Sequence, residues 1–208
     1  MKKLTPVIIV AVLVVLALVC GTSGCSTYNK LVTLEQDVDQ QWSQVEVQYQ
    51  RRMDLIPNLM RTVQGYAAHE SNTYESVTRA RAGLDNAMNA ANADSAAAAT
   101  SDPAAFQRYT QAQESLNRAL SIYVNAVREA YPDLKADAQF LNLQTQLEGT
   151  ENRIATERGR YTETVRDYNL QVRRFPGNIW AGIFGFGTKP QYSADPAAAQ
   201  APTVEFPS

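Results

Sequence analysis

The residues that could carry nucleophilic, acid–base or metal chemistry are few and lie far apart. His69 is the only histidine in 208 residues, and the only cysteines, Cys20 and Cys25, both lie in an apolar N-terminal segment. Glu148 and Glu151 lie one helical turn apart, but carboxylate-bridged metals in helix bundles use Glu-x-x-His motifs, and the sequence has none. We therefore predict a protein that is not an enzyme and that holds no metal or other cofactor.

Two arginines interrupt the apolar faces of the expected helices. Arg52 and Arg81 each stand where the three-four spacing of apolar residues requires an apolar side chain. Each could keep its guanidinium in water, pair with a carboxylate in an internal polar layer, or help to bind an anion. An anion site would be formed by Arg52, Asp54, Asn58 and Arg81. The candidates for a polar layer or partner site are Arg51, Arg52, Asp54, Asn58, Arg81, Glu148 and Glu151, with Glu70 as a further partner.

Pro57 lies inside the longest apolar pattern of the chain. Proline lacks an amide hydrogen and its ring crowds the carbonyl group one turn earlier, which costs about 3 kcal/mol in mid-helix. The apolar spacing nevertheless continues in phase, from Tyr49 through Ile56 to Val63. The pattern predicts a single helix with a kink at Pro57 rather than two helices.

These residues are expected on helices, because helical periodicity dominates the chain after residue 30 and no stretch alternates with period two. Asp102 and Pro103 are a helix-start signal, while Pro132 and Asp133 separate two further helices. The expected helices cover about residues 30–69, 71–95, 103–130 and 133–174. Their short connections favour an all-α, antiparallel (up-down-up-down) four-helix bundle with long helices, spanning residues 28–174 and followed by a short irregular C-terminal tail.

The N-terminal segment, residues 1–27, is typical of a membrane anchor. Lys2 and Lys3 precede an unbroken apolar run over residues 7–19, and no charge follows before Lys30. Lysines at this place favour a cytoplasmic N-terminus and a body outside the cytoplasm. The segment is long enough for one transmembrane helix. Alternatively, "TSGC" at residues 22–25 resembles a lipoprotein cleavage site with Cys25 as the lipid-modified residue.

The C-terminal part, residues 175–208, begins with "FPGNIWAGIFGFGTKP" and continues as a proline- and alanine-rich tail. The first stretch is apolar but too short to cross a bilayer. In an up-down-up-down bundle it would lie beside the anchor, so we expect Trp180, Phe184 and Phe186 at the membrane surface. It could also pack back on the end of the bundle and cover Leu31 or Leu34. We expect the tail from residue 191 to be extended or disordered.

The charges of the chain exclude one class of partner. The net charge is -2, with 19 basic and 21 acidic residues mixed along the sequence. Nucleic-acid binding needs clustered positive charge, so we expect no nucleic acid as a partner.

Several motifs together resemble the LemA family. They are the stretch "YNKLVTLEQDVDQQWSQVEVQYQRRMDLIPNLMRTVQGYAAHE", the short motifs "VTRARA" and "VRDYN", the stretch "YPDLKADAQFLNLQTQLEGTENRIATERGRY" and the end "FPGNIWAGIFGF". The resemblance covers nearly the whole chain, although Thr162 stands where the family commonly has asparagine. It implies a membrane-anchored, extracytoplasmic four-helix domain whose N-terminal helix is usually kept uncleaved. It implies no established reaction.

The expected function is that of a structural or interaction module of the bacterial cell envelope, anchored in the cell membrane. Its partners would be the membrane, through the N-terminal segment, and envelope proteins or further copies of the chain. The alternative is a small-ligand or stress sensor whose bundle changes conformation about Pro57.

Overall fold

The computed structural model describes residues 4–68, 74–93 and 96–192, with side chains from residue 22 onward apart from that of residue 97. Over these residues the protein is all-helical, with five α-helices and no strand. We expected the tail from residue 191 to be extended or disordered. From residue 193 it lies outside the described residues, as do Lys2, Lys3, His69 and Glu70.

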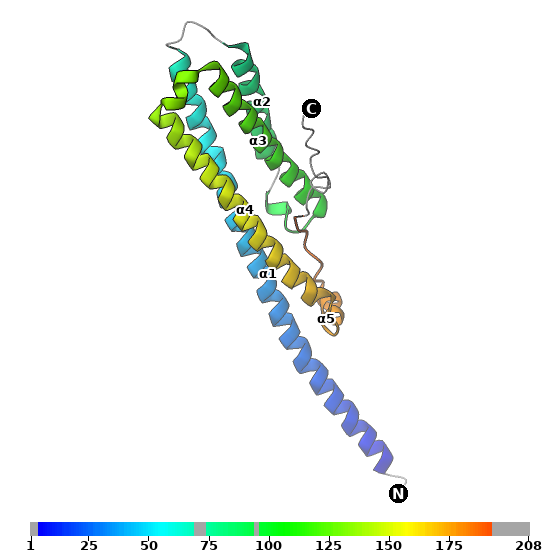
Figure 1. Ribbon diagram of the computed structural model, residues 1–208. Coiled ribbons are helices and arrows are strands. Elements are labelled where there is room, and N and C mark those ends of the chain that lie inside the picture. Colours follow the sequence, from blue (N-terminus) through cyan, green and yellow to red (C-terminus); the bar gives the residue numbers. More distant parts are fainter. Residues whose placement is uncertain (1–3, 69–73, 94–95, 193–208) are drawn as a thin grey trace, which may run out of the picture.

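Helix α1, Leu4–Ala67, runs along the whole length of the molecule and passes through Pro57 as one helix (Figure 1). Helix α4, Ala138–Arg173, lies beside it. Helices α2, Glu75–Ala93, and α3, Pro103–Ala130, pack on each other along the half of the body that is farther from the N-terminus. The third and fourth helices are joined by a 3-10 helix, Pro132–Ala136.

Local sequence signals explain most of the helix ends. The Asp102 carboxylate accepts a hydrogen bond from the Ala104 amide at 2.9 Å, and Pro103 stands at the first turn of α3, where its missing amide hydrogen costs nothing. Helix α4 begins later than predicted, because residues from Pro132 form the 3-10 helix. Its cap is therefore Asp137, whose carboxylate accepts from the Phe140 amide at 2.8 Å, and not Asp133.

The segment after α4 is more regular than predicted. We expected an irregular stretch, but residues Gly177–Phe184 form a short helix, α5, that contacts both α1 and α4. Gly185 ends this helix with φ of 80°, a left-handed conformation that glycine adopts without strain. Residues 186–192, which we call the C-terminal strap, then turn back along the body (Figure 1).

Two groups of buried side chains divide the body. The distal core lies in the half where α1, α2, α3 and α4 all contribute: Met53, Leu55, Ile56, Leu59, Met60, Val63, Val77, Leu84, Ala91, Leu116, Leu120, Tyr123, Val127, Tyr131, Leu134, Phe140 and Leu147. The proximal core lies nearer the N-terminus, between α1 and α4, and is completed by the start of α3 and by α5: Leu31, Val38, Trp42, Val45, Tyr49, Ala99, Phe106, Tyr109, Ile154, Tyr161, Val165, Tyr168, Val172 and Ala181.

Candidate functional site

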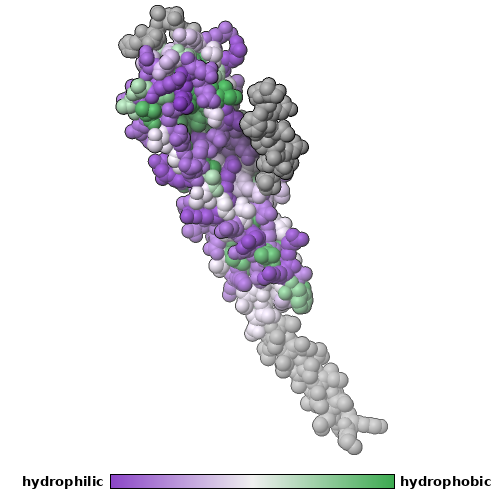
Figure 2. All heavy atoms as spheres, viewed as in Figure 1, coloured by the Kyte–Doolittle hydropathy of each residue, from purple (hydrophilic) through white to green (hydrophobic). Residues whose placement is uncertain are grey.

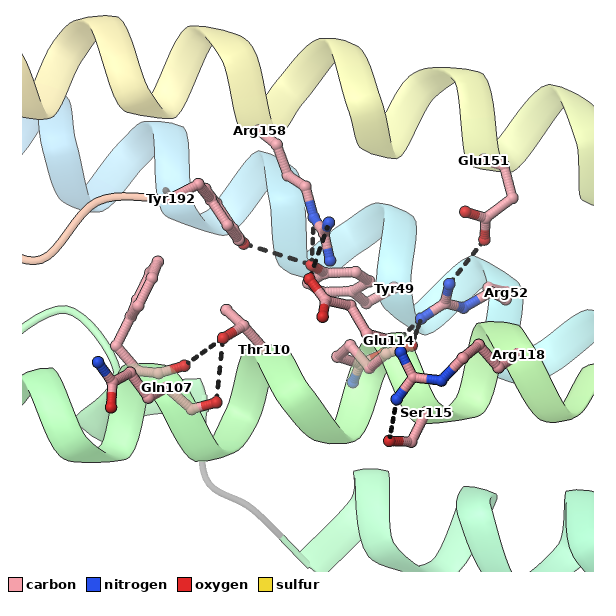
Figure 3. Close-up of polar contacts among 12 residues, drawn as sticks. Tyr49, Arg52, Gln107, Thr110, Glu114, Ser115, Arg118, Glu151, Arg158 and Tyr192 are labelled. Carbon is pink, nitrogen blue, oxygen red and sulfur yellow. Dashed lines mark hydrogen bonds and ion pairs between the residues drawn. The ribbon is translucent and has the colours of Figure 1, made fainter. Parts of the chain in front are cut away.

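Arg52 lies at the boundary between the two cores and is almost completely buried, with 1% of its surface exposed. Its Nη1 donates to Glu151 Oε1 at 2.6 Å, and its Nη2 donates to the carbonyl and side-chain oxygens of Gln113 at 3.0 and 2.7 Å. The three residues come from α1, α4 and α3 (Figure 3). One guanidinium therefore connects three helices, and sliding any one of them would leave a buried charge without its partner.

Arg158 forms a second polar cluster beside the first. Its Nε donates to the Tyr49 hydroxyl at 2.8 Å, and its guanidinium lies 5.5 Å from the Tyr49 ring centre and 4.8 Å from that of Tyr192. Tyr192 also contacts Tyr49, with 3.3 Å between the two hydroxyl oxygens (Figure 3). The cluster joins α1 and α4 to the C-terminal strap through cation–π and hydrogen-bond contacts.

The strap is held at further points. The Asn169 side chain donates to the Lys189 carbonyl at 2.9 Å and accepts from the Lys189 amide at 2.8 Å. Lys189 Nζ lies 2.9 Å from Glu35 Oε1 and 3.6 Å from Asp39 Oδ1, while the Tyr161 hydroxyl donates to the Pro190 carbonyl at 3.0 Å. Helices α1 and α4 thus both bind the strap.

The sequence signals did not identify these strap contacts. An extended segment that binds through its backbone and through a few separate side chains leaves no periodic pattern in the sequence. The only available signal was the aromatic and basic content of "TKPQY" at residues 188–192.

The other predicted polar residues are not assembled around Arg52. Asp54 and Asn58 are exposed, and each bonds within α1, to Gln50 at 2.8 Å and to Arg61 at 2.5 Å. Arg51 and Pro57 also face outward. At about 100° per residue, positions 54 and 58 lie roughly 200° and 240° around the helix from position 52.

Arg81 lies well away from Arg52. It lines a cavity together with Met60 and Ala67 of α1, at least two helical turns beyond Arg52. The anion site that we expected from Arg52, Asp54, Asn58 and Arg81 is therefore not formed.

Glu148 is exposed and lines a groove of about 520 Å³ between α3 and α4, together with Arg128 and the edge of Glu151. Glu148 and Glu151 therefore differ in role, although they are one turn apart. Glu151 turns inward to Arg52, and Glu148 remains in solvent. Among the described residues, no three histidine, cysteine or acidic side chains gather as a metal site requires.

An apolar surface lies at the end of the body nearest the N-terminus. The side chains of Phe175, Ile179, Ile183 and Phe184 are exposed by 80, 49, 64 and 44%, and we call them the α5 collar. Apolar side chains at this end appear in green at the lower end of the coloured surface in Figure 2. Single exposed apolar residues are ordinary, but a group of four on and beside one short helix indicates a contact surface.

The α5 collar is fixed to α1 by aromatic contacts. The Trp180 ring lies so close to Gly24 that a Cβ atom there would come within 2.9 Å of it. The Tyr28 ring packs edge-on against Phe184 at 4.9 Å and Phe186 at 5.8 Å between ring centres. Trp180 and Phe186 are partly buried, and Phe186 packs against the proximal core. Of the three predicted membrane-surface aromatics, Phe184 is thus the most exposed.

The first residues of α1 adjoin this surface. Cys25 is exposed and lies inside the continuous helix, one residue after Gly24. The side chains of the predicted membrane-directing run, residues 7–19, lie outside those that the structure describes. In the part that is described, no helix combines the length and the apolar character needed to cross a membrane.

Comparisons with known proteins agree with the sequence motifs. The model of the LemA family matches residues 41–206. The magnetosome proteins MamQ 1 and MamQ 2 of Paramagnetospirillum magneticum are each 27% identical over 180 residues, which cover 82% of this chain and 66% of each relative. The magnetosome protein MamQ of Magnetospirillum gryphiswaldense is 26% identical over 206 residues, covering 92% of this chain and 74% of the relative.

Proposed function

Because this chain belongs to the LemA family, we propose that it is a non-enzymatic, membrane-anchored module of the bacterial cell envelope, with its helical body outside the cytoplasm. The body would hold a surface for partner proteins, or for further copies of the chain, at a fixed distance from the membrane. The names of the relatives are those of magnetosome proteins and not of enzymes, which supports a structural or interaction role.

The proposed anchor is the N-terminal part of α1. Lys2 and Lys3 precede the apolar run of residues 7–19, and lysines in that position favour a cytoplasmic N-terminus. We favour an uncleaved transmembrane helix over a lipoprotein anchored at Cys25. A cut before Cys25 would remove Gly24, and with it the surface against which Trp180 packs.

The observation that carries this function is the position of the α5 collar. Four exposed apolar side chains lie on and beside α5, which packs against residues 24–28 of α1 at the end of the uncharged N-terminal segment. Aromatic rings that are apolar on one side and wet on the other are favoured at the depth of lipid headgroups. The proposed membrane contact thus has two parts, the anchor itself and the α5 collar next to it.

The two tryptophans allow a direct test. Trp42 is buried in the proximal core, whereas Trp180 lies at the α5 collar. In vesicles that contain lipids brominated near the headgroup, we expect the fluorescence of Trp180 in a Trp42→Phe variant to be quenched. The fluorescence of Trp42 in the matched Trp180→Phe variant should not change. Equal quenching of both tryptophans, or quenching of neither, would show that the α5 collar is not part of the membrane contact.

The form of the anchor is tested separately with Cys25→Ser. This change blocks lipid attachment without altering the helix, so an uncleaved anchor predicts unchanged size and unchanged membrane fractionation. A protein that accumulates at precursor size, or that leaves the membrane fraction, would establish the lipoprotein form.

Partners are tested by cross-linking in native membranes. A structural or interaction module should give a defined partner or a homo-oligomer at native expression. A monomer that cross-links to nothing would exclude this role.

A further inference from the structure

Two arginines interrupt the apolar helix faces, and their surroundings differ. Both terminal nitrogens of the Arg52 guanidinium donate to Glu151 or Gln113. Arg81, on α2, is partly buried, and the structure gives it no hydrogen bond or ion pair to any described residue. A guanidinium carries five N–H donors and keeps its charge in proteins, so Arg81 has donors that no described residue uses. Its surroundings therefore require an explanation.

Arg81 lines a cavity of about 320 Å³ between α1, α2 and α3, at the end of the body farthest from the N-terminus (Figure 1). One wall is apolar and comes from Met60, Val63 and Ala67 of α1 and from Val77 of α2. The volume lies at the lower end of the range of about 300–1,000 Å³ that small-molecule sites occupy. The cavity is therefore large enough for a few heavy atoms with a short apolar part.

Two tyrosines add hydrogen-bond donors to the same space. Tyr123 and Tyr131 line the cavity and are 1% and 3% exposed, and the structure gives their hydroxyl groups no hydrogen bond to any described residue. Burial raises the pKa of Tyr123 to about 12, which the nearby Arg81 partly opposes, while Tyr131 and Asp85 raise it further. The Tyr123 hydroxyl is thus protonated at neutral pH and can donate, and it lies close to Arg81.

We propose that this cavity binds a carboxylate that bears a small apolar group. Arg81 would supply the charge-assisted hydrogen bond, Tyr123 and Tyr131 would supply neutral donors, and the wall of α1 would cover the apolar group. One guanidinium matches one negative charge. The Asp85 carboxylate near Tyr123 disfavours a dianion such as phosphate, which needs more positive charge than Arg81 provides.

Two sources supply this chemistry, a free short-chain organic acid and the C-terminal carboxylate of a partner peptide ending in an apolar residue. Both place a carboxylate on Arg81 and an aliphatic group on Met60 and Val63. This site is independent of the membrane contact at the opposite end of α1, so either can fail without the other.

The test uses the full-length chain in lipid nanodiscs and ligand-observed NMR. The ligands are 4-methylpentanoate, its uncharged amide, inorganic phosphate, and the peptide Ala-Ala-Leu with a free or an amidated C-terminus. We expect at least one of the two carboxylates to bind about tenfold or more tightly than its amide, because a hydrogen bond to a charged group is lost in the amide. Binding of the organic acid indicates a small-molecule source, and binding of the peptide acid alone indicates a partner's C-terminus.

Variants locate the binding. Arg81→Gln should lower the affinity for the carboxylate about tenfold or more. Tyr123→Phe keeps the ring and removes only the hydroxyl, and it should lower the affinity about threefold or more. Arg79→Gln is the matched control, since Arg79 is two residues away on α2, is exposed and pairs with Glu75. It should change binding less than twofold. Asp85→Asn should tighten binding, which a merely unfolded variant cannot do.

Three results would overturn the assignment. The first is that neither carboxylate binds at concentrations up to tens of millimolar. The second is that phosphate binds more tightly than both carboxylates. The third is that Arg79→Gln and Arg81→Gln lose the same affinity for the carboxylate. Circular dichroism of each variant checks that the helices remain.

Discussion

The distal and proximal cores bury their side chains in different ways. In the distal core, four helices surround the apolar residues, and only three of the seventeen buried residues are aromatic. In the proximal core, six of the fourteen are aromatic, and α1 and α4 have only the start of α3, α5 and the strap to cover them. Two long helices cannot enclose a side chain between them. Large rings, which bury about 150–250 Å² each, and a covering segment compensate for the missing helices.

The comparison shows why the C-terminal strap is part of the body. Tyr192 packs on Phe106 and Tyr161 at 5.0 and 5.8 Å between ring centres, which covers aromatic residues that α2 does not reach. In the distal half that cover is provided by α2 and α3. In the proximal half an extended segment, the strap, thus takes the place of a covering helix. It is held by hydrogen bonds and by the ion pairs of Lys189.

The two cores should differ most in the free energy of unfolding that is lost when one side chain is truncated in each. Trp42→Ala removes a ring that contacts Phe106, Tyr109 and Tyr161 and a hydrogen bond of 3.1 Å from its Nε1 to the Ala96 carbonyl. We expect a loss of about 3–5 kcal/mol in the free energy of unfolding, measured by urea denaturation. Leu84→Ala in the distal core should cost about 2–3 kcal/mol. A larger loss for Leu84→Ala would contradict the dependence of the proximal core on its rings.

The boundary between the cores is tested with Arg52→Met. Removing one partner of a buried ion pair usually costs about 3–5 kcal/mol, and we expect about 2–3 kcal/mol because the Glu151 side chain is 32% exposed. The double variant Arg52→Met with Glu151→Met should recover part of the loss, since no charge then remains at the site. Chemical denaturation of the three proteins measures this. A double variant no more stable than Arg52→Met would show that an unpaired Glu151 charge is not the cause of the loss.

The strap is tested with Asn169→Ala, which removes both hydrogen bonds to the Lys189 backbone. We expect a loss of about 1–2 kcal/mol and an increase of about tenfold in hydrogen exchange at the Lys189 amide, with little change in the distal core. Asn152→Ala is the control, because Asn152 is exposed on the same helix. Equal exchange at Lys189 in both variants would mean that Asn169 does not hold the strap.

The smallest effect is expected at the end of the proximal half nearest the N-terminus. Glycine to alanine in the middle of a helix normally stabilises by about 0.5–1 kcal/mol. Gly159→Ala should do so because, beyond the adjoining helix backbone, no described atom lies within 4 Å of the new Cβ. Gly24→Ala should lose that gain, since its Cβ would meet the Trp180 ring. Thermal unfolding measures the change in stability, and the Trp180 emission maximum reports whether the ring is displaced. A stabilised Gly24→Ala variant with unchanged Trp180 emission would show that this contact is loose.

The sequence predicted the four long helices well, because their signals are periodic or local, but it did not predict α5. The three-four spacing indicated the helices, and "SDP" at residues 101–103 located the start of α3 correctly. Asp133 and Asp137 are both plausible caps after Pro132. The choice between them depends on Leu134, which is buried in the distal core and holds the 3-10 helix in place.

The rest depends on contacts between residues that are distant in sequence. Arg52 and Arg81 have the same signature in the sequence, an arginine at an apolar position. Only the packing of α3 and α4 decides that Arg52 meets Glu151, whereas Arg81 faces a cavity. Likewise, nothing local to Asn169 indicates that it binds the backbone of a residue 20 positions later.

The continuity of α1 has a mechanical consequence. From Cys25 to Ala67 the helix extends for roughly 63 Å, at about 1.5 Å per residue. A rod of that length acts as a lever. If its N-terminal part tilts by about 20°, an ordinary angle for a helix in a bilayer, the far end moves sideways by roughly 20 Å. The α5 collar lies at the short arm and the distal cavity at the end of the long one. If the proposed membrane contact forms, a small change in it would therefore become a large displacement of the distal tip.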